Sequence, residues 1–534
     1  MHPYVVEEFS EDERAVLRRY FTNLEGPVFA LVNLPEVVKG ALFARYSRSS
    51  KSLRRLFLDE FVGDLDLSGD ATVDATVGLA RADELYQRIF VEYGDDSVAQ
   101  LGGVHLACEQ ASNLLTKVLE HGRLMSYLEQ STRYIGYDRR LANGHYRFYR
   151  DHDLLESRLG ARYVGEMDRM FDTYRELLPR LTDWLARRYP KTAEDTDFVY
   201  RQAIRAKALD GLRGLLPASA LSNLGIYASG QAHEALLLRM RANGLPEARH
   251  YAELMRVELE KVIPSFLRRV DVPERGGAWV EYLELTERQS TAAVEGLRLD
   301  RPAEAADVVH LVSFDLAGED RVLEAIIFER SRATHAEAAA RVARLSEAER
   351  DALFDAYVGE RKNRRHRPGR AFERTDYRFE VVSDYGAFRD LQRHRLLTIE
   401  WQGLGVDLGY AVPEVVVDAG LEEPYRQSLD RSGELYEAVA AELPEQARYC
   451  VALAFRMRFA MQMNAREAMH VIELRSGPQG HPNYRRVAQE MGRLIAHQAG
   501  HTRIARAMHF VDYSDVDLER LEAERAAERN RAAR

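Results

Sequence analysis

The same order of features occurs twice in this chain of 534 residues. A strand-like run at 28–32 precedes the segment 41–49, which reads Ala-Leu-Phe-Ala-Arg-Tyr-Ser-Arg-Ser. A second strand-like run at 308–312 precedes 325–333, which reads Ala-Ile-Ile-Phe-Glu-Arg-Ser-Arg-Ala. With a one-residue shift both segments contain Phe-x-Arg, and both continue into a helical, basic stretch. Because internal self-similarity of this kind indicates repeated structural units, the chain is predicted to contain two related halves.

Composition limits the class of protein. Nearly half of the residues are apolar and 30% are charged, which is typical of a soluble globular protein. Cys108 and Cys450 are the two cysteines, so neither a disulfide framework nor a cysteine metal site is expected. The N-terminus lacks signal-peptide order, and no apolar run approaches membrane-span length. A net charge of -10 argues against bulk nucleic-acid binding. We therefore expect a cytoplasmic protein that binds neither membrane nor nucleic acid.

Periodicity predicts a helix-rich chain. Apolar residues at spacings of three and four predict an amphipathic helix over 104–119. Further helices are predicted at 153–190, 231–270, 335–357 and 384–397. The predicted division is an N-terminal domain at 1–271, a linker with some local helix at 272–302, a C-terminal domain at 303–517 and a charged tail at 518–534 that is a solvated helix or frayed.

The clearest local pattern lies at 455–475. Apolar and polar residues alternate from Phe455 to Asn464, which predicts a strand with one apolar face and one polar face. Asn464 followed by Glu467 predicts a capping box that opens a helix, with Glu473 on the polar face of that helix. A strand that aims arginines at the start of a capped helix is a plausible anion site.

Two motifs carry a resemblance to a known family. Residues 121–134 read His-Gly-Arg-Leu-Met-Ser-Tyr-Leu-Glu-Gln-Ser-Thr-Arg-Tyr, and residues 393–398 read Arg-His-Arg-Leu-Leu-Thr. Together they resemble the signature Arg-His-Arg-x-x-Ser-x-x-Glu-x-Ser-x-Arg-Tyr of the flavin-dependent thymidylate synthases, the ThyX family. The first half keeps the end of the signature and has lost its opening, whereas the second half keeps the opening. Upstream, Gly94 to Val98 aligns with a further family segment, in which Asp95 replaces a histidine.

The downstream motifs of that family are retained in the second half. They read Met457-Arg458, Asn464-Ala465-Arg466 and Leu474-Arg475, and His481 and Arg486 follow. In the first half, Asn223, Ser229 and Gln231 stand at the positions that correspond to Arg458, Asn464 and Arg466. The first half has therefore lost the arginines that the second half keeps, and the losses in the two halves are complementary.

The resemblance implies an α+β fold, with two tandem ThyX-like domains that are helix-rich and contain a small sheet each. It implies an enzyme that methylates dUMP to dTMP with FAD as cofactor and with NADPH and methylenetetrahydrofolate as co-substrates. The dUMP-binding residues would be Glu129, Ser131, Thr132, Arg133, Arg458 and Arg486. The FAD-binding residues would be Arg393, His394, Arg395, Arg475 and His481. No protein nucleophile is required, and the expected assembly is a homodimer that imitates the family's tetramer.

Other hypotheses stay open beside this one. Asp95, and Glu473 in place of an asparagine common at the family's flavin site, favour an enzyme for another pyrimidine nucleotide or a non-catalytic nucleotide-binding or scaffold protein. His497 and His501 are four apart, as metal ligands on a helix can be, but no third ligand is evident and we predict no metal site.

Overall fold

The computed structural model describes residues 4–62, 100, 102–193, 195–299, 306–518, 520, 521, 524, 525, 528 and 529. The segment Gly94 to Val98 lies outside these residues. The chain divides into two compact units, and each unit draws on both halves of the sequence. Unit 1 comprises Met1–Glu176, Leu215–Pro302 and Arg426–Ala452, and unit 2 comprises Leu177–Gly214, Ala303–Tyr425 and Leu453–Arg534.

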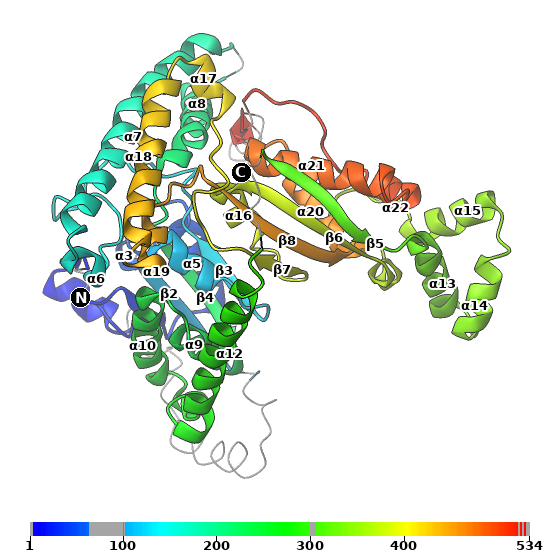
Figure 1. Cartoon of the computed structure of the whole chain (residues 1–534), viewed down its shortest axis with the longest axis horizontal. Helices are drawn as coiled ribbons and strands as arrows, with labels where there is room; N and C mark the ends of the chain where they lie inside the picture. The colour runs from blue at the N-terminus through cyan, green and yellow to red at the C-terminus, as the bar shows by residue number, and fades with distance from the viewer. Residues whose placement is uncertain are drawn as a thin grey trace. The chain divides into compact units, whose positions relative to one another are not determined.

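Each unit is built around one four-stranded antiparallel sheet (Figure 1). The strand order is β1-β2-β4-β3 in unit 1 and β5-β6-β8-β7 in unit 2. In unit 1 the strands are β1 (Val28–Leu31), β2 (Gly103–Ser112), β3 (Met125–Glu129) and β4 (Leu221–Ser229). In unit 2 they are β5 (Val308–Phe314), β6 (Asp376–Asp384), β7 (Thr398–Trp401) and β8 (Arg456–Asn464). The matching order confirms the predicted α+β fold with two related halves.

Helices surround both sheets. Unit 1 contains α1 (Glu11–Leu17), α2 (Glu36–Tyr46), α3 (Leu53–Glu60), α5 (Asn113–Leu119), α6 (His152–Glu156), α9 (Gly230–Arg241), α10 (Pro246–Glu260), α11 (Pro264–Leu267), α12 (Ala278–Glu295) and α19 (Pro444–Ala447). Unit 2 contains α8 (Asp197–Leu212), α13 (Gly318–Arg330), α14 (His335–Val342), α15 (Glu347–Val358), α16 (Tyr385–Leu391), α17 (Glu414–Asp418), α20 (Ala465–Arg475), α21 (Pro482–His497) and α22 (Thr502–Ala507). The long helices α7 (Gly160–Arg188) and α18 (Glu422–Ala440) contribute residues to both units.

The predicted strand–helix unit at 455–475 is present as β8 and α20. Alternate residues of β8 are buried, and Met457, Met461 and Met463 lie in the core. The Asn464 side chain accepts a hydrogen bond of 2.9 Å from the Glu467 amide and so caps α20. The Glu467 carboxylate contacts two histidines, described below, in place of the reciprocal capping bond. Glu473, predicted on the polar face, is buried against Arg361.

The predicted helix at 104–119 is wrong for its first two turns. Residues 103–112 form the central strand β2, and the helix α5 begins only at Asn113. Strand β2 lies between β1 and β4, and most of its residues are buried. A strand buried on both faces shows no alternation, so its apolar positions can match helical spacing by chance.

Two further predicted helices differ in the structure, whereas the linker contains local helix as expected. The helix predicted at 335–357 is two helices, α14 and α15, because Ser346 opens a new capping box. The helix predicted at 384–397 ends at Leu391, so Arg393-His394-Arg395 lies in the following turn. The linker contains the 18-residue helix α12, which has no buried residue. In the tail, Arg520 is buried and Arg525 donates to Asp195 at 2.7 Å, so this part is anchored in unit 2.

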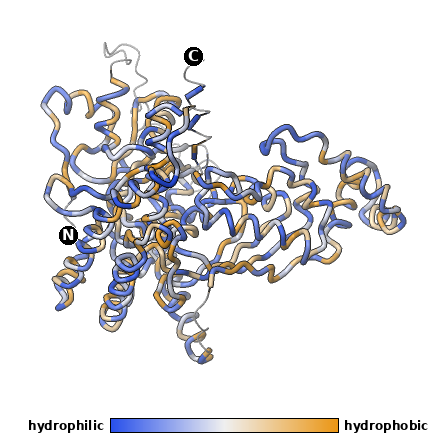
Figure 2. The backbone as a smooth tube through the Cα atoms, turned by 90° about the horizontal axis from the view of Figure 1, so that it is seen from above, coloured by the Kyte–Doolittle hydropathy of each residue, from blue (hydrophilic) through white to orange (hydrophobic). Residues whose placement is uncertain are grey.

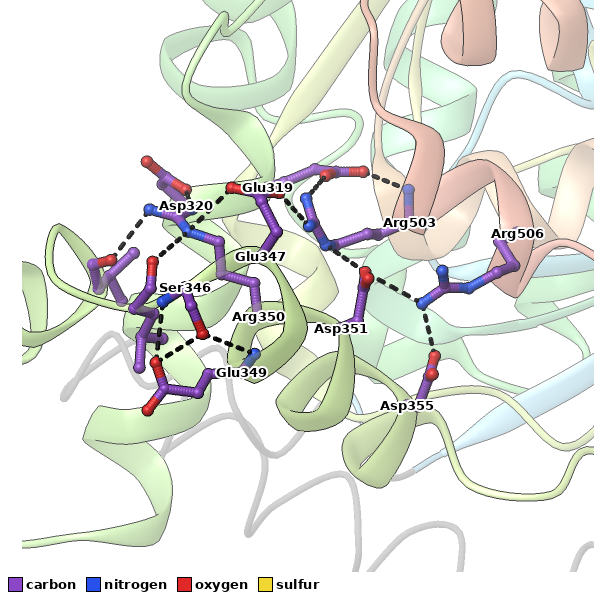
Figure 3. A network of polar contacts seen from close by, with 12 residues as sticks. Glu319, Asp320, Ser346, Glu347, Glu349, Arg350, Asp351, Asp355, Arg503 and Arg506 are labelled. Atoms are coloured by element: carbon purple, nitrogen blue, oxygen red, sulfur yellow. Dashed lines mark hydrogen bonds and ion pairs between the residues drawn. The ribbon is translucent and has the colours of Figure 1, made fainter.

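Charged side chains attach the group of helices α13, α14 and α15 to helix α22 in unit 2 (Figure 3). Arg503 donates to Glu319 at 3.0 Å and to Asp351 at 2.8 Å, and Arg506 donates to Asp355 at 2.7 Å. Because several carboxylates share two guanidinium groups, the network fixes the helices more firmly than isolated surface pairs do.

No helix among the described residues is both long and apolar enough to cross a bilayer. Hydrophilic and hydrophobic residues are interspersed along the backbone (Figure 2), as expected for helices with one buried face.

Residues 426–452 belong to the second half of the sequence but pack in unit 1. Tyr449 of this segment donates a hydrogen bond of 2.9 Å to Glu247 of α10. The same carboxylate accepts from the backbone amide of Ser112 at 2.8 Å and from its hydroxyl at 2.5 Å. Burial raises the pKa of Glu247 to about 7, despite these hydrogen bonds.

Glu247 should therefore make unit 1 less stable as pH rises. The unfolded chain releases this proton near pH 4.5 and the folded chain near pH 7, so stability falls by about 3 kcal/mol across that interval and is then constant. Glu247→Gln should remove this dependence. Urea unfolding at pH 5 and pH 8 measures it, with Glu253→Gln on the exposed face of α10 as the control. Equal pH dependence in wild type and Glu247→Gln would contradict the assignment.

Candidate functional site

The loop Gln130 to Tyr134 in unit 1 continues directly from strand β3. The Gln130 amide donates to the Asn223 carbonyl at 2.8 Å, and its side-chain nitrogen donates to the Ser49 carbonyl at 2.5 Å. The Ser131 amide donates to the Ser47 carbonyl at 3.1 Å. The loop is thus held against β4 and against the end of α2. The repeated segment 41–49 therefore supports this motif, a role that spacing alone did not indicate.

The predicted nucleotide-binding residues of this loop differ in accessibility. Ser131 is half-buried, whereas Thr132 and Arg133 are buried. The Glu129 carboxylate is also buried and lies 3.3 Å from the Lys117 amine, which neutralises its charge. In this conformation Glu129 stabilises the base of the loop.

Arg48 is a basic residue of this region that sequence reasoning did not select. Its guanidinium lies over the Tyr134 ring, 5.2 Å from the centroid. Arg147 donates to the Gln130 side-chain oxygen at 3.1 Å. Arg48 follows the repeated Phe-x-Arg motif, and this position in the repeat is the sequence feature that could have identified it. The loop region therefore carries more positive charge than its motif shows.

In unit 2 the turn Arg393-His394-Arg395 packs against α20. Arg475 at the end of α20 donates from Nε to His394 Nε2 at 2.8 Å. His394 Nδ1 lies 3.7 Å from Glu467, whose carboxylate is 3.2 Å from His470 Nδ1. The structure thus brings the opening of the family signature to the downstream Leu-Arg motif. We call His394, Glu467 and His470 the histidine–glutamate cluster.

The hydrogen bond from Arg475 fixes the protonation state of His394. Nε2 must accept, so the proton of the neutral ring is on Nδ1 and faces Glu467. Burial and then Arg475 lower the pKa of His394 to about 4. Burial alone would raise the pKa of Glu467, but hydrogen bonds from His394 and His470 lower it to about 2.

The histidine–glutamate cluster has metal-ligand chemistry, since its three candidate atoms lie within 4.8 Å of one another. A metal on His394 Nδ1 would place the ring proton on Nε2, directly opposite the N–H of Arg475 at 2.8 Å. Two opposed donors at that distance repel, so the observed arrangement fits a proton-bearing hydrogen-bond chain better than a metal centre.

The polar chain extends beyond the predicted residues. Arg475 lies over the Tyr484 ring at 5.4 Å from the centroid, and burial lowers its pKa. Asp390, whose charge favours protonated Arg475, accepts from Arg213 at 3.2 Å. Arg213 is buried and comes from the first half of the sequence, and its Nε has no hydrogen-bond partner among the described residues. Nothing local in the sequence around Arg213 indicated a role here.

A cavity of 260 Å³ opens at the start of α21 in unit 2. His481, which caps α21, and Arg486 both line it, so two predicted residues meet there. Lys207 of α8 and Arg456 of β8 also line it, and Arg456 pairs with Asp307 at 2.6 Å. Asp210, Asp307 and Glu414 line the cavity as well, and Arg486 lies 3.7 Å from Glu414. Acidic and basic side chains are therefore balanced around the start of α21.

The remaining predicted residues are more accessible. Arg395 is exposed. Arg458 lies half-buried on the polar face of β8 and donates to Glu380 of β6 at 2.5 Å. A bound phosphate could compete with this half-exposed carboxylate for the guanidinium.

Residues 41–265 and 325–499 match the family described as thymidylate synthase complementing protein. The chain belongs to this family. The two matched segments agree with the two sheets of equal strand order, and they confirm the family resemblance found in the motifs. The flavin-dependent thymidylate synthase family is thus represented here by a chain with two copies of its domain.

Two relatives match almost the whole length of this chain. A UPF0159 protein of Chlamydia muridarum (strain MoPn / Nigg) is 39% identical over 523 residues, which are 97% of this chain and 98% of that protein. UPF0159 protein Ta1429 of Thermoplasma acidophilum is 31% identical over 517 residues, 91% of this chain and 97% of that protein. Among solved structures, the UMP/dUMP methylase PolB from Streptomyces cacaoi bound with 5-Br dUMP covers 40% of this chain and 99% of its own, at 19% identity and a TM-score of 0.32.

Proposed function

We propose that this protein methylates dUMP to dTMP with FAD as cofactor and with methylenetetrahydrofolate and NADPH as co-substrates. The observation that carries the proposal is the meeting of the half-buried Arg393 and Arg475 with the buried His394. These residues come from motifs about 80 positions apart in the sequence, a separation that only a shared site explains economically.

The proposed nucleotide contacts use residues of both halves of the chain. Ser131, Thr132 and Arg133 would hold the sugar and phosphate, and Arg458 and Arg486 would contribute guanidinium groups. A phosphate dianion needs such planar donors together with hydroxyl or backbone N–H groups. Arg486 lines the cavity at the start of α21 beside Lys207, and its carboxylate partner Glu414 is exposed, which supports this assignment.

The residues around His394 fit a flavin by the chemistry of their donors. Arg393 and Arg475 are half-buried cations, and reduction of a flavin places negative charge on its N1–C2=O region. Arg395 and His481 would complete the set. A bound flavin supplies redox chemistry, and the folate supplies the carbon unit.

The protein's own contribution would be binding, orientation and proton placement. Glu467 holds the Nδ1 proton of His394, and Arg475 occupies Nε2, so the ring presents a single tautomer. His394 is neutral at physiological pH because its pKa is about 4. No side-chain nucleophile is assigned.

Replacing either Arg133 or Arg458 by alanine should weaken dUMP binding by about 10- to 100-fold, the cost of one charge-assisted hydrogen-bonded contact. Isothermal titration with dUMP measures this. Arg493→Ala, on the exposed face of α21, is the control and should bind as wild type. Unchanged dUMP affinity in either Arg133→Ala or Arg458→Ala would sink the shared assignment.

The reaction itself is tested with purified full-length protein. A flavin absorption band in the blue and dUMP-dependent release of tritium from the uracil C5 position are expected. A flavin band without dTMP formation would indicate another pyrimidine nucleotide as substrate. Absence of both signals after reconstitution with FAD would refute enzymatic function and favour a nucleotide-binding or scaffold role.

A further inference from the structure

Unit 1 contains a cavity of 680 Å³, within the range of small-molecule sites. It lies between the turn after α5, the face of α9 and the start of α12. Its walls include the apolar side chains of Leu124, Leu238 and Trp279. Leu124 is 75% exposed and Trp279 is 54% exposed, so large apolar surface is left uncovered at the cavity.

The cavity is also strongly basic. Among the described residues that line it, four are arginines and one, Glu234, is a carboxylate; the arginines are Arg123, Arg239, Arg269 and Arg275. Glu234 is already bound by Arg269 through two hydrogen bonds, of 3.1 and 2.7 Å. Among the described residues, no carboxylate pairs with the half-buried Arg239 guanidinium. Desolvation lowers the pKa of Arg239, and desolvation followed by the charges of Arg239 and Arg123 lowers the pKa of His121.

The sheet register identifies the corresponding place in unit 2. Ser126 of β3 is paired with Tyr227 of β4, and Thr398 of β7 is paired with Gln462 of β8. In both sheets a capping residue follows two positions after the β4 or β8 partner, and a helix begins there. The two cross-strand residue pairs are therefore equivalent positions in the two sheets, and other residues can be matched by counting along the chain from them.

Counting from the residue pair and the cap matches three small residues with the histidine–glutamate cluster: Gly122 with His394, Ala232 with Glu467, and Ala235 with His470. All three small residues line the cavity. Unit 2 thus fills with a buried polar cluster the same space that unit 1 leaves open. The duplication has produced one closed position and one open position.

We propose that the open cavity of unit 1 binds a planar heteroaromatic anion, with the ring against Trp279 and the anionic group at Arg239. A flat ring covers the exposed apolar wall, and a phosphate or carboxylate neutralises the excess guanidinium charge. A flavin phosphate and a folate carboxylate share this chemistry. The site is independent of the nucleotide contacts proposed above, because it uses none of those residues.

Trp279 provides a local reporter in the full-length chain. FMN and 5-formyltetrahydrofolate are titrated separately, and Trp279-dependent fluorescence is taken as the difference between wild type and Trp279→Phe. Saturable quenching by at least one probe is expected. Quenching by FMN alone identifies the phosphate-bearing ring as the ligand type, and quenching by the folate alone identifies the carboxylate-bearing ring.

Two variants test the assigned walls. Ala235→Phe fills the cavity and Arg239→Gln removes its unpaired charge, so each should raise the apparent Kd at least about 10-fold. Ala293→Phe, at an exposed position of α12, makes the same size change outside the cavity and should leave the Kd unchanged. Far-UV circular dichroism and the Tm establish that each variant is folded. Absence of quenching by both probes, or an unchanged Kd in both folded cavity variants, would overturn the proposal.

Discussion

Replacing Arg361 by alanine is expected to destabilise unit 2 by about 3–5 kcal/mol. Both side chains of the Arg361–Glu473 pair are about 1% exposed, and two hydrogen bonds of 2.7 and 2.6 Å join them. Arg361 also donates to the carbonyls of His366 and Ala507. Removing the guanidinium leaves the Glu473 carboxylate buried without its counter-charge, and that uncompensated charge, more than the lost attraction, sets the size of the effect.

Urea unfolding at pH 7 measures the loss. Arg341→Ala is the matched control, because Arg341 pairs with Glu349 at the exposed surface and should contribute at most about 1 kcal/mol. The double replacement Arg361→Met with Glu473→Leu should recover most of the lost stability, since it removes both charges and keeps the volume. A loss of under 1 kcal/mol in Arg361→Ala would show that the pair is open to solvent.

Cutting the chain between Pro302 and Ala303 should leave neither fragment able to fold alone. Unit 1 would lose residues 426–452, including the buried Tyr449 and the pairing of Ala218 with Val451. Unit 2 would lose residues 177–214, including Arg213, which binds Asp390, and Asp210, whose carbonyl contacts His481. Each fragment would expose part of a core that the other fragment normally completes.

Co-expression of the two fragments should restore a stable complex, because all the missing segments are then supplied in trans. Co-purification through a tag on one fragment, followed by near-UV circular dichroism, checks this. Each fragment alone should aggregate or lack fixed aromatic packing. A cooperative thermal transition for either fragment by itself would contradict the exchange of segments as a folding requirement.

The exchange explains why domain boundaries are hard to read from the sequence. The predicted limits at 271 and 303 follow the duplicated order of motifs, which records ancestry. Compactness instead depends on which segments pack together, and 177–214 and 426–452 each belong to the compact unit whose sheet comes from the opposite half of the sequence. Their periodicity is that of ordinary amphipathic helices, so nothing local names their partner.

Sequence reasoning was most successful where structure is local. The alternation in β8 and the cap at Asn464 depend on residues a few positions apart. It was least successful where burial on two sides removes the pattern, as in β2. Glu473 is the other case, because a charged residue in a polar helical position gave no sign that Arg361 would bury it.

By itself, the sequence determined the duplication, the family signature divided between two halves, the strands β1, β5 and β8, and several of the helices, because these depend on local composition and spacing. Only the tertiary structure decided that the position is an open cavity in unit 1 and is filled by polar side chains in unit 2. Gly122, Ala232 and Ala235 are unremarkable as letters, and the sheet register alone shows that they stand where His394, Glu467 and His470 fill unit 2. The walls of the cavity come from segments that are far apart in the sequence, so its presence in unit 1 depends on how those segments pack.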